Sequence, residues 1–144
     1  MANTVMTSFK TELLSGDHDI ATGGDAYYLA LYTSASSIND ATTTVYTTAN
    51  EVPNSGTYVA GGLQLAGQAV SASGTTAIVD FTDRSFTSAT ITARYALIYK
   101  WNASPGSTKA VCVLDFGSDQ TSTSGTFTIQ FPAAGASTAI IRVA

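Results

Sequence analysis

The triplet Asp115-Phe116-Gly117 is the one stretch of the chain that matches a catalytic motif. In protein kinases an Asp-Phe-Gly aspartate holds magnesium, but a kinase also needs a glycine-rich phosphate loop, a strand lysine and a catalytic loop. None of these patterns occurs in the 144 residues. We therefore interpret the triplet as a strand that ends at Phe116, with Gly117 taking a positive φ and the next two residues turning the chain.

A second group of polar residues combines Asp17, His18, Asp19 and Asp25 within a short stretch. Such a group could bind calcium if its acceptors followed the spacing of a calcium-binding loop. Counted from Asp17, the fifth and sixth positions are alanine and threonine, where that loop needs an acceptor and a glycine. We interpret these side chains as solvated loop residues.

Asp80 and Asp83 are the remaining candidate pair for acid–base chemistry. Glycosidases place two carboxylates at a defined distance in space, which spacing along one strand cannot establish. Arg84 follows directly, so the simpler prediction is an ion pair.

Nucleophilic chemistry has little support, because the chain holds one cysteine and one histidine. Cys112 lies inside the apolar run AVCVLDF, which favours a buried, inert side chain. A reactive thiol or hydroxyl needs a base beside it, and the G-x-S-x-G pattern does not occur. We predict that the protein is not an enzyme and that it uses no metal or cofactor.

The composition points to a β-rich chain. Charged residues make up 11% of the chain, about half the usual share, so its polarity rests on Thr and Ser. The net charge is −4 and the six cations are scattered, which argues against nucleic-acid and anionic-membrane partners. No apolar run has the length of a membrane span or of a signal-peptide core.

The hydrophobic pattern predicts a single domain over residues 1–144. Apolar residues at helical spacing predict a helix from Asn3 to Gly16, within an N-terminal arm (1–16) that is free to reach a partner. A strand at 25–33 follows, and then a long polar connection at 34–58. Six further strands are predicted, at 63–73, 75–82, 89–101, 109–117, 126–132 and 137–144.

This order predicts an all-β fold of about seven or eight strands with a short N-terminal helix. A β-sandwich and a jelly-roll-like barrel both remain open.

The seven tyrosines and the single tryptophan are the best candidates for a binding surface. Tyr and Trp bury a large area and keep a polar group, so they suit interfaces as well as cores. Packing in the core and contact with a partner are both open for them. The candidate partner-interface residues are Phe9, Leu13, Tyr46, Tyr58 and Trp101.

The order of segments resembles a family of small virion structural proteins of tailed bacteriophages. The most specific part is ATITARYALIY followed by AVCVLDFGSDQTSTSGTFTIQFP and AIIR, and the resemblance extends over nearly the whole chain. The family carries no catalytic motif to transfer.

The resemblance implies a virion component that is made in the cytoplasm of a bacterial host. Our first expectation is a decoration (cement) protein on the capsid surface, bound to the major capsid protein as a homo-oligomer, with a trimer favoured. A tail, neck or fibre component is the alternative within the same particle. A carbohydrate- or receptor-binding module is the alternative from another class.

Overall fold

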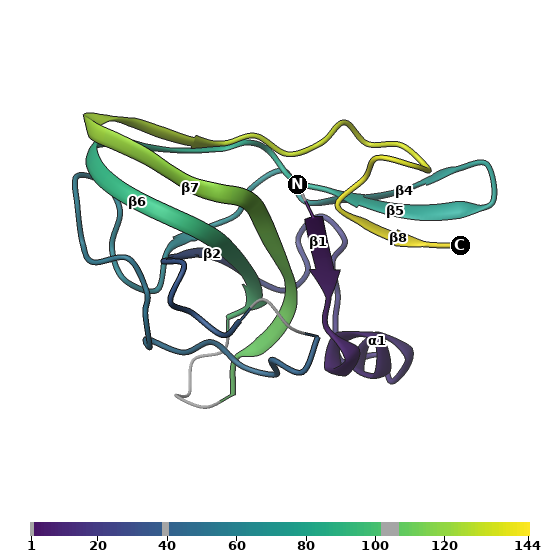
Figure 1. Ribbon diagram of the computed structural model, residues 1–144. Coiled ribbons are helices and arrows are strands. Elements are labelled where there is room, and N and C mark those ends of the chain that lie inside the picture. The colour runs from purple at the N-terminus through teal and green to yellow at the C-terminus, as the bar shows by residue number, and fades with distance from the viewer. Residues whose placement is uncertain (1, 39–40, 102–106) are drawn as a thin grey trace.

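Figure 1 shows the computed structural model, which describes residues 2–38, 41–101 and 107–144. Strands dominate this part of the chain, and one short helix lies near the N-terminus, so the predicted all-β class is confirmed. No helix in the described ranges is long and apolar enough to cross a membrane. The elements are β1 (Ala2–Val5), α1 (Thr7–Leu14), β2 (Tyr27–Tyr32), β3 (Leu63–Gln64), β4 (Ala69–Ser73), β5 (Thr76–Asp80), β6 (Arg84–Lys100), β7 (Lys109–Ile129) and β8 (Ile141–Val143).

The strands form two antiparallel sheets. The larger has the order β1-β7-β6-β2-β3 and the smaller the order β4-β5-β8. Each sheet therefore has two edge strands, and neither closes on itself. Figure 1 shows the small sheet extending from one side of the molecule, near both termini.

The pair formed by β6 and β7 dominates the larger sheet. The sequence predicts two strands at 109–117 and 126–132 with a turn at 117–125, but β7 runs without interruption from Lys109 to Ile129. The prediction that a strand ends at Phe116 is therefore wrong. The Ser- and Thr-rich segment stays in the sheet because β6 supplies it with a partner through most of its length.

Bulges accommodate the turn-like residues of β7. The register against β6 shifts where β7 passes from Gln120 to Asp115, and residues 116–119 lie between these pairs. Gly117 has a φ of 85° there, the positive value that we predicted for it. A bulge bends its strand and increases the local twist, so the polar segment curves β7 rather than ending it.

A second irregularity folds the strand pair back. The register shifts on both sides of Ala89, where Ser88 and Ser124 have positive φ values of 51° and 46°. Figure 1 shows both strands turning sharply at this end of the sheet, so that the last part of β7 runs back across the molecule. The bend brings the two halves of β7 toward one another.

The N-terminal prediction needs a correction. Residues 2–5 pair with β7 from Asp115 to Cys112, so the predicted helix lacks its first turn. The Met6 N–H continues this pairing by donating to the Val111 carbonyl at 3.0 Å, and α1 begins only after it. The helix ends where predicted, because Gly16 follows with a φ of 79°.

The N-terminal segment is therefore an integral part of the fold and no free arm. β1 forms one edge of the larger sheet, and Phe9 of α1 is 1% exposed in the main core. That core is supplied mostly by β2, β6 and β7, which are buried on both faces over residues 29–32, 95–99 and 110–114. The long connection at 34–58 has no helix in its described part and packs Ile38, Val52 and Tyr58 onto this core.

Candidate functional site

Four aromatic side chains form a cluster, which we call the aromatic surface: the partly exposed Tyr28, Tyr46 and Trp101, and the buried Tyr99 beneath them. Tyr28 and Tyr99 are paired across β2 and β6. The Tyr46 ring stacks on Tyr99, with 4.8 Å between ring centroids and an interplanar angle of 20°. The Trp101 ring lies 5.0 Å from that of Tyr28, and its side chain is 44% exposed. The sheet and the long connection thus build this surface together.

Glu51 holds the aromatic surface in place through hydrogen bonds to its carboxylate. Its carboxylate accepts hydrogen bonds from the Tyr58 hydroxyl at 2.8 Å and from the Gly61 N–H at 2.6 Å. It also accepts a short hydrogen bond from Tyr46, at 2.5 Å. The Tyr99 hydroxyl donates to the Gly61 carbonyl at 2.6 Å, which extends the network to the next ring. The aromatic surface is therefore preorganised rather than loose.

The tyrosine hydroxyls of this network remain neutral donors. Burial raises the pKa of Tyr46, and the hydrogen bond to Glu51 and its charge raise it further. Burial also raises the pKa of Tyr58 and Tyr99, again with a contribution from the Glu51 charge. None of these groups can act as a base near neutral pH, so the network serves to hold its members in place.

Replacement of Glu51 by alanine should destabilise the protein by about 3 kcal/mol, because buried donors that lose their acceptor cost roughly 1–3 kcal/mol each. Glu51→Gln keeps the shape and one acceptor oxygen, so it should cost about 1 kcal/mol. Urea unfolding of both variants measures the difference. Two variants that unfold at the wild-type midpoint would show that the network contributes no stability.

The structure separates the five predicted interface residues. Tyr46 and Trp101 both belong to the aromatic surface and flank Tyr99. Tyr58 is fully buried, because its hydroxyl accepts the Leu31 N–H at 2.9 Å and its ring packs edge-on against a core phenylalanine. The prediction that Tyr58 offers a surface to a partner is therefore wrong.

The prediction that Phe9 contacts a partner is wrong for the same reason, because its ring is buried, with its centroid 4.8 Å from that of the His18 ring. Leu13 is half-buried and lies along an apolar groove of about 420 Å³ between α1 and the small sheet. Leu14, next to it, is 89% exposed. This groove is on elements distinct from those of the aromatic surface.

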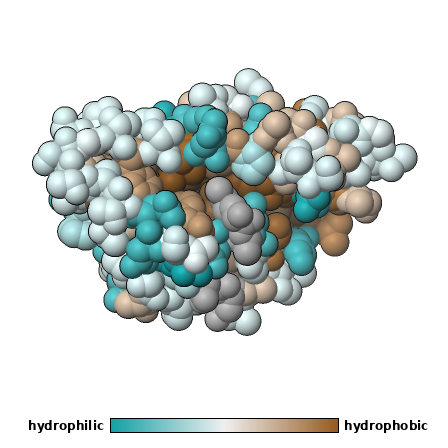
Figure 2. All heavy atoms as spheres, turned by 45° about the horizontal axis from the view of Figure 1, so that its top comes forward, coloured by the Kyte–Doolittle hydropathy of each residue, from teal (hydrophilic) through white to brown (hydrophobic). Residues whose placement is uncertain are grey.

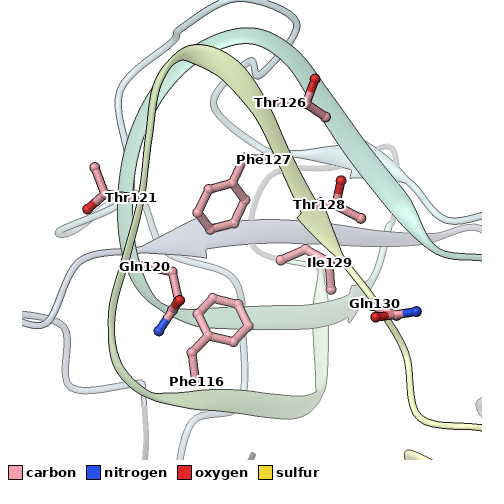
Figure 3. Close-up of a pocket in the computed structure, with 8 residues that line it drawn as sticks. All are labelled: Phe116, Gln120, Thr121, Thr126, Phe127, Thr128, Ile129 and Gln130. Atoms are coloured by element: carbon pink, nitrogen blue, oxygen red, sulfur yellow. The ribbon is translucent and has the colours of Figure 1, made fainter.

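A hollow of about 530 Å³ lies in the bend of β7 (Figure 3). Phe116 and Phe127 approach one another across it, with ring centroids 6.3 Å apart. The Gln120 side chain reaches into it, and its amide is fixed by a 3.1 Å hydrogen bond to the Ser118 hydroxyl. The hollow is lined by Phe116, Gln120, Thr121, Thr126, Phe127, Thr128, Ile129 and Gln130.

Figure 2 shows the hydropathy of one face of the molecule, which is mostly pale or teal. Brown, hydrophobic atoms show in hollows near the middle of this face, and further brown and tan atoms lie along its right edge.

The Asp-Phe-Gly aspartate has a structural role. Asp115 accepts a hydrogen bond from Arg94 Nε at 2.6 Å and a second from the Gly117 N–H at 2.8 Å. The hydrogen bond from Arg94 is the main reason that the pKa of Asp115 is lowered. Its carboxylate therefore fixes the bulge of β7.

The carboxylates of the 17–25 loop are also engaged. Lys100 Nζ lies 2.7 Å from Asp25, and Lys109 Nζ lies 3.2 Å from Asp17. His18 is buried between the Glu12 carboxylate at 2.8 Å and the Tyr27 hydroxyl at 3.0 Å. Within the described residues, no three metal-ligating side chains come together.

The remaining candidates are placed as follows. Cys112 is fully buried, and burial raises the pKa of its thiol to about 12, which fits the predicted inert role. Asp83 accepts the Phe131 N–H at 2.8 Å. The predicted ion pair of Arg84 with Asp80 or Asp83 does not form.

Comparison of the chain with protein-family models, curated proteins and solved structures returned no match.

Proposed function

We propose that this protein is a structural component of a tailed-bacteriophage virion, and that it acts by covering and joining other virion proteins rather than by catalysis. Its partner in this proposal is the major capsid protein, on the outer capsid surface, where it acts as a decoration protein. The resemblance of its segments to small virion proteins supports this role, and so does a compact β-fold with a hydroxyl-rich exterior.

The observation that carries the proposal is the aromatic surface. Exposed Trp and Tyr side chains are enriched at the energetic centres of protein interfaces, because they bury much area at a low entropic cost. Trp101 is 44% exposed and packs on Tyr28, while Tyr99 and Glu51 fix the rings around it. A rigid aromatic patch of this kind suits contact with a repeating protein lattice.

Capsid binding should depend on Trp101. We expect Trp101→Ala to weaken binding to purified capsid shells by at least about 2 kcal/mol, or roughly 30-fold, as for a central interface residue. The measurement is a binding isotherm on shells that lack this protein. Leu14→Ala is the matched control, because Leu14 is an exposed apolar residue outside the aromatic surface.

Equal affinities for the wild type and Trp101→Ala, both with intact folds, would exclude the aromatic surface as the contact. Quantitative mass spectrometry of purified virions tests the location separately. A copy number that matches the capsid lattice supports decoration, and one that matches a single ring supports the alternative of a neck, tail or fibre component. Sedimentation of the free protein tests the proposed trimer.

The hollow of β7 favours a second candidate, a carbohydrate-binding module. Ligand sites commonly combine apolar or aromatic walls with a few fixed polar groups, and Phe116, Phe127 and the Gln120 amide provide this combination. A glycan array distinguishes the two functions. Specific glycan binding without capsid binding would favour the second.

A further inference from the structure

Arg84 stands out among the cations of the described residues. It is half-buried at the start of β6, and its Nε is buried without a hydrogen-bond partner. Arg94, Lys100 and Lys109 each have a carboxylate within 4 Å. Among the described residues Arg84 has none, as is also true of Lys10 and Arg142, but those two side chains are exposed. A buried donor without an acceptor costs roughly 1–3 kcal/mol, so Arg84 occupies this position at a cost to the stability of the fold.

Arg84 also lies at an open site. Its side chain lines a pocket of about 620 Å³, whose other walls are the loops 22–26 and 64–69. Three glycines, Gly23, Gly24 and Gly67, contribute to these walls, so the main chain lines the pocket at these positions. A guest can therefore come close to the main chain and to the guanidinium together.

The two loops are fixed to one another before any guest arrives. The Thr22 hydroxyl donates to the Gln68 carbonyl at 3.0 Å. The Gln68 amide donates in return to the carbonyls of Ala21 at 2.9 Å and Asp25 at 3.1 Å. The walls therefore form a rigid frame, which reduces the entropic cost of binding.

The charge balance of the pocket leaves the guanidinium available. Asp25 is the acidic residue in its lining, but its carboxylate pairs with Lys100 at 2.7 Å and accepts the Asp19 N–H at 2.7 Å. Asp83, the neighbour of Arg84 in sequence, is engaged by the Phe131 N–H. Neither carboxylate pairs with Arg84.

We propose that this pocket is an oxyanion site, in which Arg84 binds a carboxylate or phosphate group. The planar guanidinium presents parallel N–H groups that match two oxygens of such a group, and the charge-assisted hydrogen bonds are stronger than neutral ones. The source is either a small free anion or an acidic side chain of a neighbouring protein. The site is independent of the aromatic surface and of the proposed function.

The test follows the Arg84 Nε–H resonance of ¹⁵N-labelled full-length protein during titration with sodium acetate and sodium phosphate, with sodium chloride keeping the ionic strength constant. We expect a saturable shift in the wild type, and binding that is at least about tenfold weaker in Arg84→Gln, monitored at the amides of the 22–26 loop. Arg142→Gln is the matched control, since Arg142 is exposed and outside the pocket.

Two further readouts complete the test. Without added anion, Arg84→Gln should be at least as stable as the wild type, because it removes a buried nitrogen that has no hydrogen-bond partner, whereas an arginine that stabilises the fold would give a less stable variant. A peptide rich in Asp and Glu that competes with acetate identifies a protein carboxylate as the source, and absence of competition identifies a free anion. Linear, non-saturating shifts that are alike in wild type and Arg84→Gln would overturn the proposal.

Discussion

Removal of residues 2–16 should leave a chain that no longer unfolds cooperatively. The deletion takes away edge strand β1, with its four paired residues, together with the buried side chains of Met6 and Phe9. Loss of one buried phenylalanine side chain alone costs about 3–5 kcal/mol, against a typical total stability of about 5–15 kcal/mol. Urea unfolding followed by circular dichroism measures the outcome. A truncated chain with the wild-type midpoint would mean that this segment is, after all, a dispensable arm.

Point variants in α1 test the packing of this segment without shortening the chain. Phe9→Ala should lower the free energy of unfolding by about 3–5 kcal/mol, because Phe9 is 1% exposed. Leu14→Ala is its matched control, and should stay within about 0.5 kcal/mol of the wild type because Leu14 is 89% exposed. Equal effects of the two substitutions would contradict the packing of α1 described above.

Stability should fall steeply above about pH 10, the ordinary pKa of tyrosine. Tyr27, Tyr32, Tyr58 and Tyr99 are fully buried, and burial raises the pKa of each. A raised pKa means that the folded chain holds protons which the unfolded chain has already released. The stability from these hydroxyls is thus complete below pH 10 and is lost as the pH rises beyond it, by up to about 1.4 kcal/mol per pH unit for each tyrosine.

Urea unfolding at pH 9, 10 and 11 measures this slope. Tyr32→Phe provides the control, since it removes one of these hydroxyls, which donates to the Thr47 carbonyl of the connection at 2.6 Å. The variant should lose stability less steeply with pH, by about one proton's share of the slope. Equal stability of the wild type at pH 9 and pH 11 would show that these hydroxyls ionise freely in the folded chain.

The sequence predicted correctly those elements that are determined by their own hydrophobic pattern, without reference to a distant partner strand. The run at 25–33 is apolar on both faces, as a central strand should be, and β2 occupies its middle. The pattern at 2–5 failed because it continues the helical spacing of α1, while its sheet partner lies at 112–115. The middle of β7 was predicted as a turn because of its Ser- and Thr-rich composition. Its extended conformation depends on the pairing with β6, which the local sequence does not reveal.

The candidate site was predictable only in part. Tyr46 and Trp101 were identified from residue type, but their common neighbour Tyr99 and the anchor Glu51 depend on contacts that the long connection makes after folding. Residue type alone cannot separate an exposed tyrosine from a buried one, which is why Tyr58 was placed at the surface. Arg84 was predicted to form an ion pair with a nearby aspartate because the residues are close in sequence. Adjacent side chains on an extended chain point to opposite sides, so closeness in sequence does not bring Asp83 and Arg84 together.

The position of β1 also bears on how the molecule is made. Residues 2–5 are synthesised more than 100 residues before residues 112–115 of β7, with which they pair in the described part of the chain. At a translation rate of roughly 5–20 residues per second, residues 2–5 wait about 5–20 s before the strand with which they pair has been synthesised. The larger sheet can therefore be completed only after β7 has been synthesised, and until then the edge formed by residues 2–5 has no strand to pair with in that sheet.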